Sequence, residues 1–322
     1  MLAFLCGEDG YRLREKLLSL REQFFHEYPH AEERILDVEE REEREIVLKI
    51  AEMLQGGSLF SSAQVVVLSG MFSLPKDARE NIVDFFEKSY RKNKETLVIV
   101  KEEKPDKRSR LFKQLKKQAD HYEEFLFLSG VPLFSWVKEY CKKTFSEIVF
   151  EKEGIEQLLL FTRGDLFRVT NELEKLTLSL EKSEKLTSEH VKKHVTATAY
   201  SVIFSLLDVI GKKDKKQAFR LVEEQYAQGN DAFAILGMFA HHARSVASVL
   251  SLFEEKGVRD AREIARLGKV HPFVVEKILK NRMSFDLSRA RKMIHLLSRL
   301  DISAKIGKID PKLAVEEVLL RS

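Results

Sequence analysis

Short apolar runs alternate with charged stretches of helical spacing over the first 132 residues, and this alternation limits the possible folds more than any other feature. The runs read LAFLC at 2–6, RILDV at 34–38, QVVVL at 64–68, TLVIV at 96–100 and EEFLFL at 123–128. Between them, apolar residues recur at helical intervals, as at Leu13, Leu17 and Phe24. Strands that alternate with helices predict a mainly parallel sheet with helices packed on it.

The pattern changes after Pro132. No proline follows until Pro272, and glycine is sparse between them, so this part is predicted to be nearly all helical. One boundary is placed near 130–134 and a second near 196–201, where TATAYS separates an amphipathic pattern from the apolar VIFSLLDVI. The last third is interpreted as helices broken at GKKD, QGND, EKGVRD, GKVHP and IGKIDP. The expected domains are therefore 1–132, 133–200 and 201–322.

Composition indicates a soluble globular protein of a reducing cytoplasm. No apolar run approaches the roughly 20 residues that cross a bilayer, so no membrane partner is expected. Cys6 and Cys141 lack CxxC spacing, which argues against a disulfide framework and a zinc site. The net charge of +4 does not establish nucleic-acid binding, although basic residues cluster in SYRKNKE, KPDKRSRLFKQLKKQ and GKKDKK.

The first strand is followed by GEDGYRLREKLL, a position at which a phosphate-binding loop is often found. That loop requires GxxxxGK[ST], because its backbone N–H groups surround phosphates while the lysine and hydroxyl reach the terminal phosphate and magnesium. Counting from Gly7, the last three positions hold Arg12, Leu13 and Arg14. The loop is therefore absent.

Acidic residues add to this argument. Glu8 and Asp9 would place negative charge where phosphate should bind, whereas both suit the start of a helix. The apolar strand at 97–100 runs into Lys101 before Glu102 and Glu103, so the magnesium-binding acid of an ATPase is also missing. No nucleotide cofactor is expected, and an ATPase with an atypical loop remains an alternative.

Other catalytic patterns are not present. His190 and His194 share one helix face, but no glutamate follows the first histidine as a metalloprotease requires, so no metal site is nominated. No GxSxG motif occurs, and no catalytic residue is nominated. Trp136, the only tryptophan, is expected to pack between helices.

One stretch has the rhythm of a helix-turn-helix: DAREIARLGKVHPFVVEKILKNR, with a glycine at the turn and a basic second helix. Pro272 and Phe273 would occupy the start of the reading helix, where polar side chains should meet base edges. A helix-turn-helix-like DNA-binding protein is therefore kept as a second alternative.

The order of these signals resembles the delta subunit of the bacterial DNA polymerase III clamp loader over nearly the whole chain. The most specific match is GDLFRVTNELEKLTL, with Asn171, Glu172, Glu174, Lys175 and Leu176. The other matching stretches are FLCGEDGYRLREKL, GGSLFSSAQVVVLSG, LVIV with the following KPDKRSRLFKQLKK, LFSWVKEYCKK, SVIFSLLDVIGKKDKKQAF, AILGMFAHHAR, HPFVVEKIL and LLSRLDISAKIGKID.

The resemblance implies an AAA+-like α/β domain with a degenerate nucleotide site at 1–132, a small helical lid at 133–200 and an all-α collar at 201–322. It implies a protein without intrinsic enzymatic activity, which in the holoenzyme would be grouped with DNA-directed DNA polymerase. The implied partners are the sliding clamp (beta subunit), the gamma/tau and delta prime subunits of the loader, and primer-template DNA.

The resemblance also gives a role to QGGSLFSSAQVVVLSG, which carries two large apolar side chains at an apparent turn. By themselves Leu59 and Phe60 would be expected to lie in a satellite core. In delta subunits the Ser-Leu-Phe element enters a hydrophobic pocket of the clamp, so the implied clamp-binding residues are Gln55, Ser58, Leu59 and Phe60. The glycines at 56–57 are interpreted as the end of the preceding helix. Ring opening would then be driven by preferential binding to the open clamp.

Overall fold

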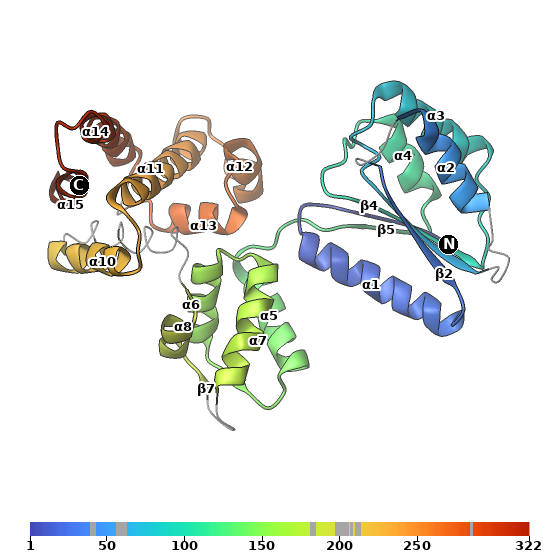
Figure 1. Ribbon diagram of the computed structural model, residues 1–322, viewed down its shortest axis with the longest axis horizontal. Helices are drawn as coiled ribbons and strands as arrows, with labels where there is room; N and C mark the ends of the chain where they lie inside the picture. The colour runs from blue at the N-terminus through green and yellow to red at the C-terminus, as the bar shows by residue number, and fades with distance from the viewer. Residues whose placement is uncertain are drawn as a thin grey trace. The chain divides into compact units, whose positions relative to one another are not determined.

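The computed structural model describes residues 1–38, 43–55, 63–180, 185–196, 206, 209, 214–283 and 286–321. The chain divides into two compact units, Met1–Phe127 and Leu128–Ser322 (Figure 1). The first is an α/β unit and the second is mostly helical, as the sequence pattern predicted. The separation of the second unit into a lid and a collar remains a prediction.

The first unit contains a five-stranded sheet in the order β2-β3-β4-β1-β5, and every neighbouring pair of its described strands is parallel. The strands are β1 Leu2–Cys6, β2 Glu32–Asp37, β3 Gln64–Ser69, β4 Thr96–Glu102 and β5 His121–Glu124. The helices are α1 Gly10–Glu27, α2 Glu43–Gln55, α3 Lys76–Lys88 and α4 Arg110–Gln118. The predicted parallel sheet with packed helices is confirmed.

Alternate residues of the strands face opposite sides of this sheet. Leu2 and Phe4 of β1 belong to the apolar cluster beneath α2, α3 and α4, whereas Ala3 and Leu5 belong to the cluster beneath α1. Figure 1 shows α1 on one face and the other three helices on the opposite face. Because both faces are covered, the inner strands read as continuous apolar runs.

The fifth strand ends earlier than its apolar sequence suggested. The run at 123–128 is predicted as a strand, but β5 ends at Glu124. Phe125 then closes the adjacent loop: its N–H donates to the Cys6 carbonyl at 2.7 Å, and its carbonyl accepts from the Asp9 N–H at 3.0 Å. Phe125 is buried by this closure, whereas Leu126 is 42% exposed. The apolar residue Phe125 therefore packs in a loop after β5 and does not pair in a strand.

Among the described residues, the second unit consists of helices and one pair of two-residue parallel strands, which the sequence pattern did not predict. Its first segment contains α5 Gly130–Thr144, β6 Val149–Phe150, α6 Lys152–Thr162, α7 Leu166–Ser179, β7 Lys185–Leu186 and α8 Ser188–His194. Its second segment contains α10 Lys215–Ala227, α11 Ala232–Glu254, α12 Ala261–Gly268, α13 Pro272–Lys280, α14 Leu287–Lys305 and α15 Pro311–Arg321.

The two segments of this unit meet at a glycine. Gly164 has φ +72°, and a Cβ atom there would lie 2.9 Å from Leu133 Cδ2 and 3.3 Å from Phe273 Cβ. The turn between α6 and α7 therefore approaches the start of α13 more closely than a side chain permits. Trp136 is half-buried on α5 and stacks on Tyr140 with ring centroids 5.4 Å apart.

α11 is the one described helix whose length and composition would allow it to span a membrane. Half of its most apolar stretch is buried, and Ile235, Phe239 and Val249 have no exposed surface. These side chains pack against neighbouring helices, so α11 is accounted for as a core helix.

Candidate functional site

The implied clamp-binding residues follow α2. Gln55 is the last residue of this helix, and nothing of its side chain is described. Ser58, Leu59 and Phe60 lie outside the described residues. The structure therefore shows what flanks this segment, and the contact itself remains a prediction.

The helix that leads into the segment is held firmly on one side. Ile46 and Ile50 are each 1% exposed and Met53 is buried, as its helical spacing predicted, and all three join the core beneath the sheet. On the opposite side Leu48 is 66% exposed and Glu52 is also exposed. α2 is thus a fixed support, with an apolar side chain facing solvent, that precedes the predicted contact in the sequence.

The return of the chain from this segment is also fixed. The carbonyl of Ala63 accepts from the Glu32 N–H at 3.1 Å, and the N–H of Gln64 donates to the Glu95 carbonyl at 2.8 Å. Both Ala63 and Gln64 are buried. Residues 56–62 therefore connect two rigid ends, the last turn of α2 and the first residues of β3.

The turn after β1 shows why phosphate would not bind there. Asp9 is the N-cap of α1: its carboxylate accepts from the Arg12 N–H at 3.2 Å and lies 3.4 Å from the Arg12 guanidinium. Asp9 is 3% exposed. The start of a helix attracts anions because its N–H groups lack partners. Here the chain's own carboxylate occupies that position, in agreement with the missing loop residues.

The same turn is closed from the side by backbone. Gly7 has φ +131°, and a Cβ atom there would lie 2.2 Å from the Phe125 carbonyl oxygen. The N–H of Gly7 donates to the Glu102 carbonyl at 2.9 Å. The Glu102 carboxylate, which follows the apolar part of β4, is buried and accepts from the Met71 N–H at 2.7 Å. It is therefore engaged in holding the chain after β3.

Two titratable side chains near this turn, Cys6 and Tyr122, are held neutral by burial. Burial raises the pKa of the Cys6 thiol, whose Sγ lies 4.0 Å from the Tyr122 hydroxyl, and burial also raises the pKa of Tyr122. In the second unit, burial raises the pKa of Cys141 to about 12. Because a thiol must lose its proton to act as a nucleophile, neither cysteine is activated. Within the described ranges, no group of three acidic, histidine or cysteine side chains is placed to hold a metal ion.

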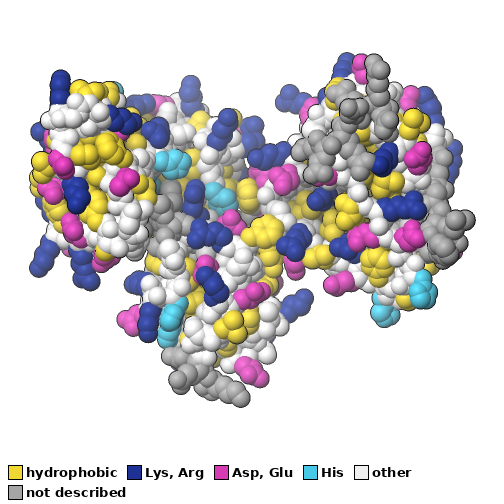
Figure 2. Space-filling view, in the orientation of Figure 1, with side chains coloured by type: hydrophobic (Ala, Val, Ile, Leu, Met, Phe, Trp, Pro, Cys, Tyr) yellow, Lys and Arg dark blue, Asp and Glu magenta, His cyan; other side chains and the backbone are white. Residues whose placement is uncertain are grey.

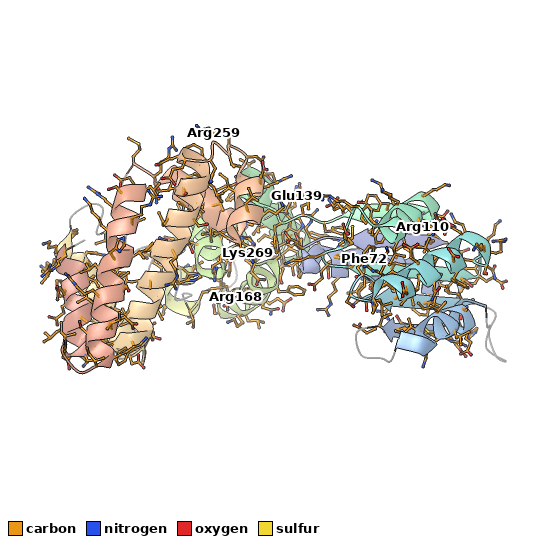
Figure 3. All side chains as sticks on the ribbon, turned by 90° about the horizontal axis from the view of Figure 1, so that it is seen from above. Phe72, Arg110, Glu139, Arg168, Arg259 and Lys269 are labelled. Carbon is orange, nitrogen blue, oxygen red and sulfur yellow. The ribbon has the colours of Figure 1, made fainter. Side chains whose placement is uncertain are left out.

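The helix-turn-helix-like stretch forms α12 and α13, joined at Lys269, which has φ +51° (Figure 3). His271 caps α13 by accepting from the Phe273 N–H at 3.3 Å, and burial lowers the pKa of His271 to about 4. Pro272 and Phe273 are buried, with Phe273 against the turn at Gly164. The first residues of this helix are thus core residues, and base edges could not reach them.

His190 also has a structural role. It lies at the third helical position of α8, where its ring and the Thr187 side chain bond reciprocally to each other's backbone N–H groups. This arrangement is a capping box, which satisfies donors at the start of a helix. His190 is therefore accounted for by the start of α8, whereas His194 is the exposed last residue of the same helix.

A groove of about 390 Å³ lies between α11 and α14. Leu236, Ala240, Ile294 and Leu297 form its apolar part, with Gly237, Arg244, Ser298, Asp301 and Lys305 around them. A Cβ atom on Gly237 would meet nothing within 4 Å. Asp301 pairs with Lys305 at 2.7 Å, whereas Arg244 has no ion pair among the described residues. This groove offers an apolar surface with one unneutralised cation.

Comparison with known proteins relates both units to one family. The family described as DNA polymerase III, delta subunit, matches residues 4–125, and the family of the C-terminal domain of that delta subunit matches residues 201–322. The DNA polymerase III subunit delta of Bacillus subtilis (strain 168) is 26% identical over 219 residues, which are 68% of this chain. The aligned part spans 62% of that relative's own length.

Two solved structures were compared with this chain, and they differ in how closely their folds match it. The Bacillus subtilis DNA clamp loader delta protein (YqeN) aligns with a TM-score of 0.73 at 22% identity, over 99% of this chain and 94% of that one. The RuvB Holliday junction branch migration motor of Thermotoga maritima aligns with a TM-score of 0.40 at 13% identity, over 87% and 79% of the two chains. The first value shows a shared fold, and the second is too low to show one.

Proposed function

The chain belongs to the family of DNA polymerase III delta subunits, and from this membership we propose that it is a clamp-loader subunit that opens the DNA sliding clamp for loading onto primed DNA. The observation that carries the proposal is the match of this family to both the α/β unit and the C-terminal helices. The protein acts by binding, without hydrolysing ATP. The buried Asp9 carboxylate at the start of α1 supports this point, because it occupies the position that phosphate would need.

The clamp contact is proposed to be Gln55, Ser58, Leu59 and Phe60. Two features support this assignment: the elements on either side of the segment in the sequence, α2 and β3, are packed into the core, and Leu48 of α2 presents apolar surface to solvent. Burying a leucine and a phenylalanine contributes roughly 1.5 to 3 kcal/mol each. Two such anchors supply a large share of the binding free energy of a micromolar complex.

Docking by itself does not open a ring. A ligand shifts an equilibrium only by its difference in affinity for the two states, and a shift from 1:99 to 99:1 requires about 5.5 kcal/mol. The protein is therefore proposed to bind the open clamp more tightly than the closed one. The outer side of α2, which carries Leu48 and Glu52, is the rigid surface proposed to press against the clamp.

The remaining partners are the gamma/tau and delta prime subunits and primer-template DNA. We propose that the α10–α15 segment is the collar and that a neighbouring member of the loader covers the groove between α11 and α14. The apolar part of the groove and the unneutralised Arg244 support a neighbour that contributes apolar and acidic side chains.

The direct test is clamp binding by the double variant Leu59→Ala with Phe60→Ala. It should lose roughly 2 to 4 kcal/mol of affinity, or about 30-fold to 1,000-fold, with an unchanged circular dichroism spectrum. Ile35→Ala is the matched control, because Ile35 is an exposed apolar residue on β2 of the same unit. Normal clamp binding by the double variant, measured by calorimetry and co-elution, would rule out this contact.

A further inference from the structure

α13 packs against both segments of the second unit. One of its faces is buried in a cluster with residues of α11, α12 and α14, through Val274, Val275 and Ile278. Glu276 and Lys277 come three and four positions after Phe273, so these three side chains share a different face. Figure 1 shows α13 at the edge of the C-terminal helices that lies next to α5–α8. α13 is therefore positioned to join the two segments.

The apolar contact of this second face is made by Phe273. A Cβ atom on Gly164, in the turn between α6 and α7, would lie 3.3 Å from Phe273 Cβ and 2.9 Å from Leu133 Cδ2 of α5. Phe273 and Leu133 are both buried. Lys277 has its Nζ 5.7 Å from the centre of the Phe273 ring, and burial lowers its pKa although the Glu156 carboxylate on α6 opposes this. Residues of α5, α6 and α13 therefore come together near Gly164.

A carboxylate of the same face lies at the start of α5. Gly130 is the first residue of α5 and has φ +53°, and a Cβ atom there would lie 2.9 Å from Glu276 Oε2 and 3.2 Å from Glu276 Oε1. Both carboxylate oxygens are therefore within van der Waals distance of the Gly130 backbone. A larger residue at this position would be strained and would push the carboxylate away. The glycine thus leaves room for a contact between α13 and α5.

α5 has no side-chain cap of its own. Ser129 occupies its N-cap position, but the Ser129 side chain makes no capping hydrogen bond, and Pro132 has no N–H group to offer in the first turn. Other helices of this unit are capped by an aspartate that directly precedes them, at Asp165, Asp214, Asp231, Asp260 and Asp286. At α5 the acid beside the first turn comes instead from α13, which is far away in the sequence.

The positive end of α5 is the charge that Glu276 meets. The first N–H groups of a helix lack partners within it and give its start a partial positive charge. Glu263 of the neighbouring α12 pairs with Arg266 at 3.9 Å, whereas no described lysine, arginine or histidine side chain forms an ion pair with the half-buried Glu276. Figure 2 shows basic and acidic side chains intermixed on the visible face of this unit, so a carboxylate without a cation departs from its general surface.

We infer that α13 is a latch, in which Glu276 holds the start of α5 and the contact opens locally while the C-terminal helices stay folded. Two observations favour local opening. Gly130 is exposed, so water can replace the carboxylate, and Glu276 lies outside both apolar clusters of the C-terminal helices. α5 is the first helix after the α/β unit in the sequence, so opening frees the point at which that unit is attached. This latch is a property of the second unit and does not depend on the proposed function.

Hydrogen exchange of the full chain, measured by mass spectrometry, tests the latch. Glu276→Gln keeps the size of the side chain and removes its charge, and Glu263→Gln is the matched control on the exposed surface of α12. Exchange is followed in peptides from α5 and from α11, the long core helix of the C-terminal segment. The thermal midpoint of each variant is recorded by circular dichroism, so that local opening is distinguished from loss of the fold.

Glu276→Gln should speed exchange in α5 by about 2-fold to 30-fold, the range expected when a charge is removed from a helix end. Exchange in α11 and the thermal midpoint should stay at wild-type values, and the control should change neither peptide. In roughly 1 M potassium chloride the wild type should approach the variant, because salt screens the contact. Equal exchange in the two variants would overturn the inference. An equal rise in α5 and α11 would also overturn it, because Glu276 would then support the fold as a whole.

Thiol labelling checks the same opening at a side chain. Ser129 is 7% exposed and precedes Gly130, so a Ser129→Cys chain reports access to the start of α5, and the two native cysteines are buried. Adding Glu276→Gln to this chain should speed its labelling by the same factor, and adding Glu263→Gln should not. An unchanged labelling rate in both would show that the start of α5 stays closed without the Glu276 charge, and the latch would be refuted. Neither measurement involves the clamp, so failure of the latch and failure of the proposed function are distinguishable.

Discussion

Acid should destabilise the second unit through two buried histidines. Burial lowers the pKa of His242 on α11 to about 3, and burial together with the Arg163 charge lowers the pKa of His271 to about 4. Asp165 opposes the effect at His271, and His241 adds to it at His242. Both side chains are neutral in the folded state and take up a proton on unfolding below the ordinary histidine pKa.

The magnitude follows from these pKa values. Each buried histidine has a folded pKa below its unfolded pKa of about 6.5, so its neutral form contributes fully to stability above about pH 6.5. This contribution is lost as the pH falls toward the folded pKa. Each histidine then reduces the free energy of unfolding by about 1.4 kcal/mol per pH unit. Between pH 6.5 and 5 the two together should remove about 3 kcal/mol, because the slope reaches its full value only well below the unfolded pKa.

His271→Asn isolates one of the two contributions. Asparagine is a good N-cap, so it can accept from the Phe273 N–H as His271 does, but it does not titrate. The pH slope of the variant should be about half that of the wild type. Urea unfolding followed by the fluorescence of Trp136 reports on the second unit alone, because Trp136 is the only tryptophan in the chain.

His295→Asn is the control, since His295 is exposed on α14 of the same unit. It should leave the pH slope unchanged. A His271→Asn protein with the full wild-type slope would refute the argument that burial at the start of α13 keeps this ring neutral. A wild-type protein equally stable at pH 6.5 and pH 5 would refute it for both histidines.

Two glycine substitutions test the fold and the collar. Gly7→Ala should destabilise the first unit by at least about 3 kcal/mol, because its φ of +131° is strained for alanine and the added Cβ would meet the Phe125 carbonyl. Thermal unfolding by circular dichroism measures this, and a loss under about 1 kcal/mol would contradict it. Gly237→Leu should stabilise α11 by up to about 1 kcal/mol, since its Cβ has open space, yet weaken assembly with the gamma/tau and delta prime subunits. Normal co-elution of the Gly237→Leu chain with those subunits would argue against the groove as their contact.

Much of the first unit could be predicted from local pattern. The inner strands appear as apolar runs because a parallel sheet covered on both faces buries their side chains, as at Val66 and Val67 of β3. The end of β5 could not be predicted in this way. Phe125 is apolar like a strand residue, but its backbone bonds to Cys6 and Asp9 and its side chain packs in the cluster beneath α1, all of which are distant in the sequence.

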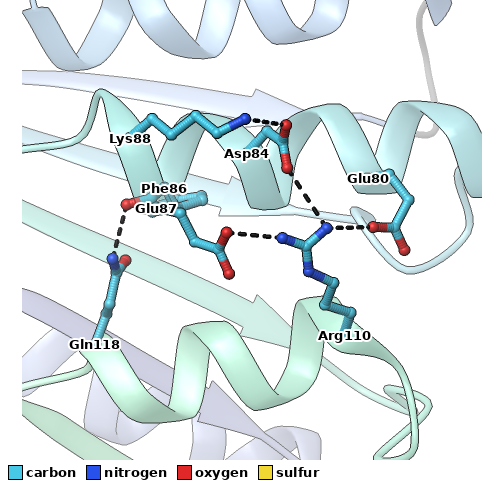
Figure 4. A network of polar contacts seen from close by, with 7 residues as sticks. All are labelled: Glu80, Asp84, Phe86, Glu87, Lys88, Arg110 and Gln118. Atoms are coloured by element: carbon cyan, nitrogen blue, oxygen red, sulfur yellow. Dashed lines mark hydrogen bonds and ion pairs between the residues drawn. The ribbon is translucent and has the colours of Figure 1, made fainter.

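For the candidate site, too, some features could be predicted from the sequence and others required the structure. The absence of a phosphate-binding loop could be read directly from Arg12, Leu13 and Arg14. The position of the Asp9 carboxylate at the start of α1 was expected of a helix cap, and the structure adds its burial. The basic stretch KPDKRSRLFKQLKKQ was visible in the sequence, but the ion pairs that Arg110 (Figure 4), Lys92 and Lys107 make are known only from the folded chain.

The amino-acid sequence alone determined the alternation of strands and helices, the helical second half and the lack of nucleotide-binding residues, because these depend on side chains close together along the chain. The tertiary structure decided which side chains are buried and which titratable groups are held neutral by that burial. Closure of the turn at Gly7 by Phe125 and burial of the start of α13 near Gly164 arise from segments that only folding brings together. The local sequence pattern does not predict such contacts, because they form between residues that are far apart in the sequence.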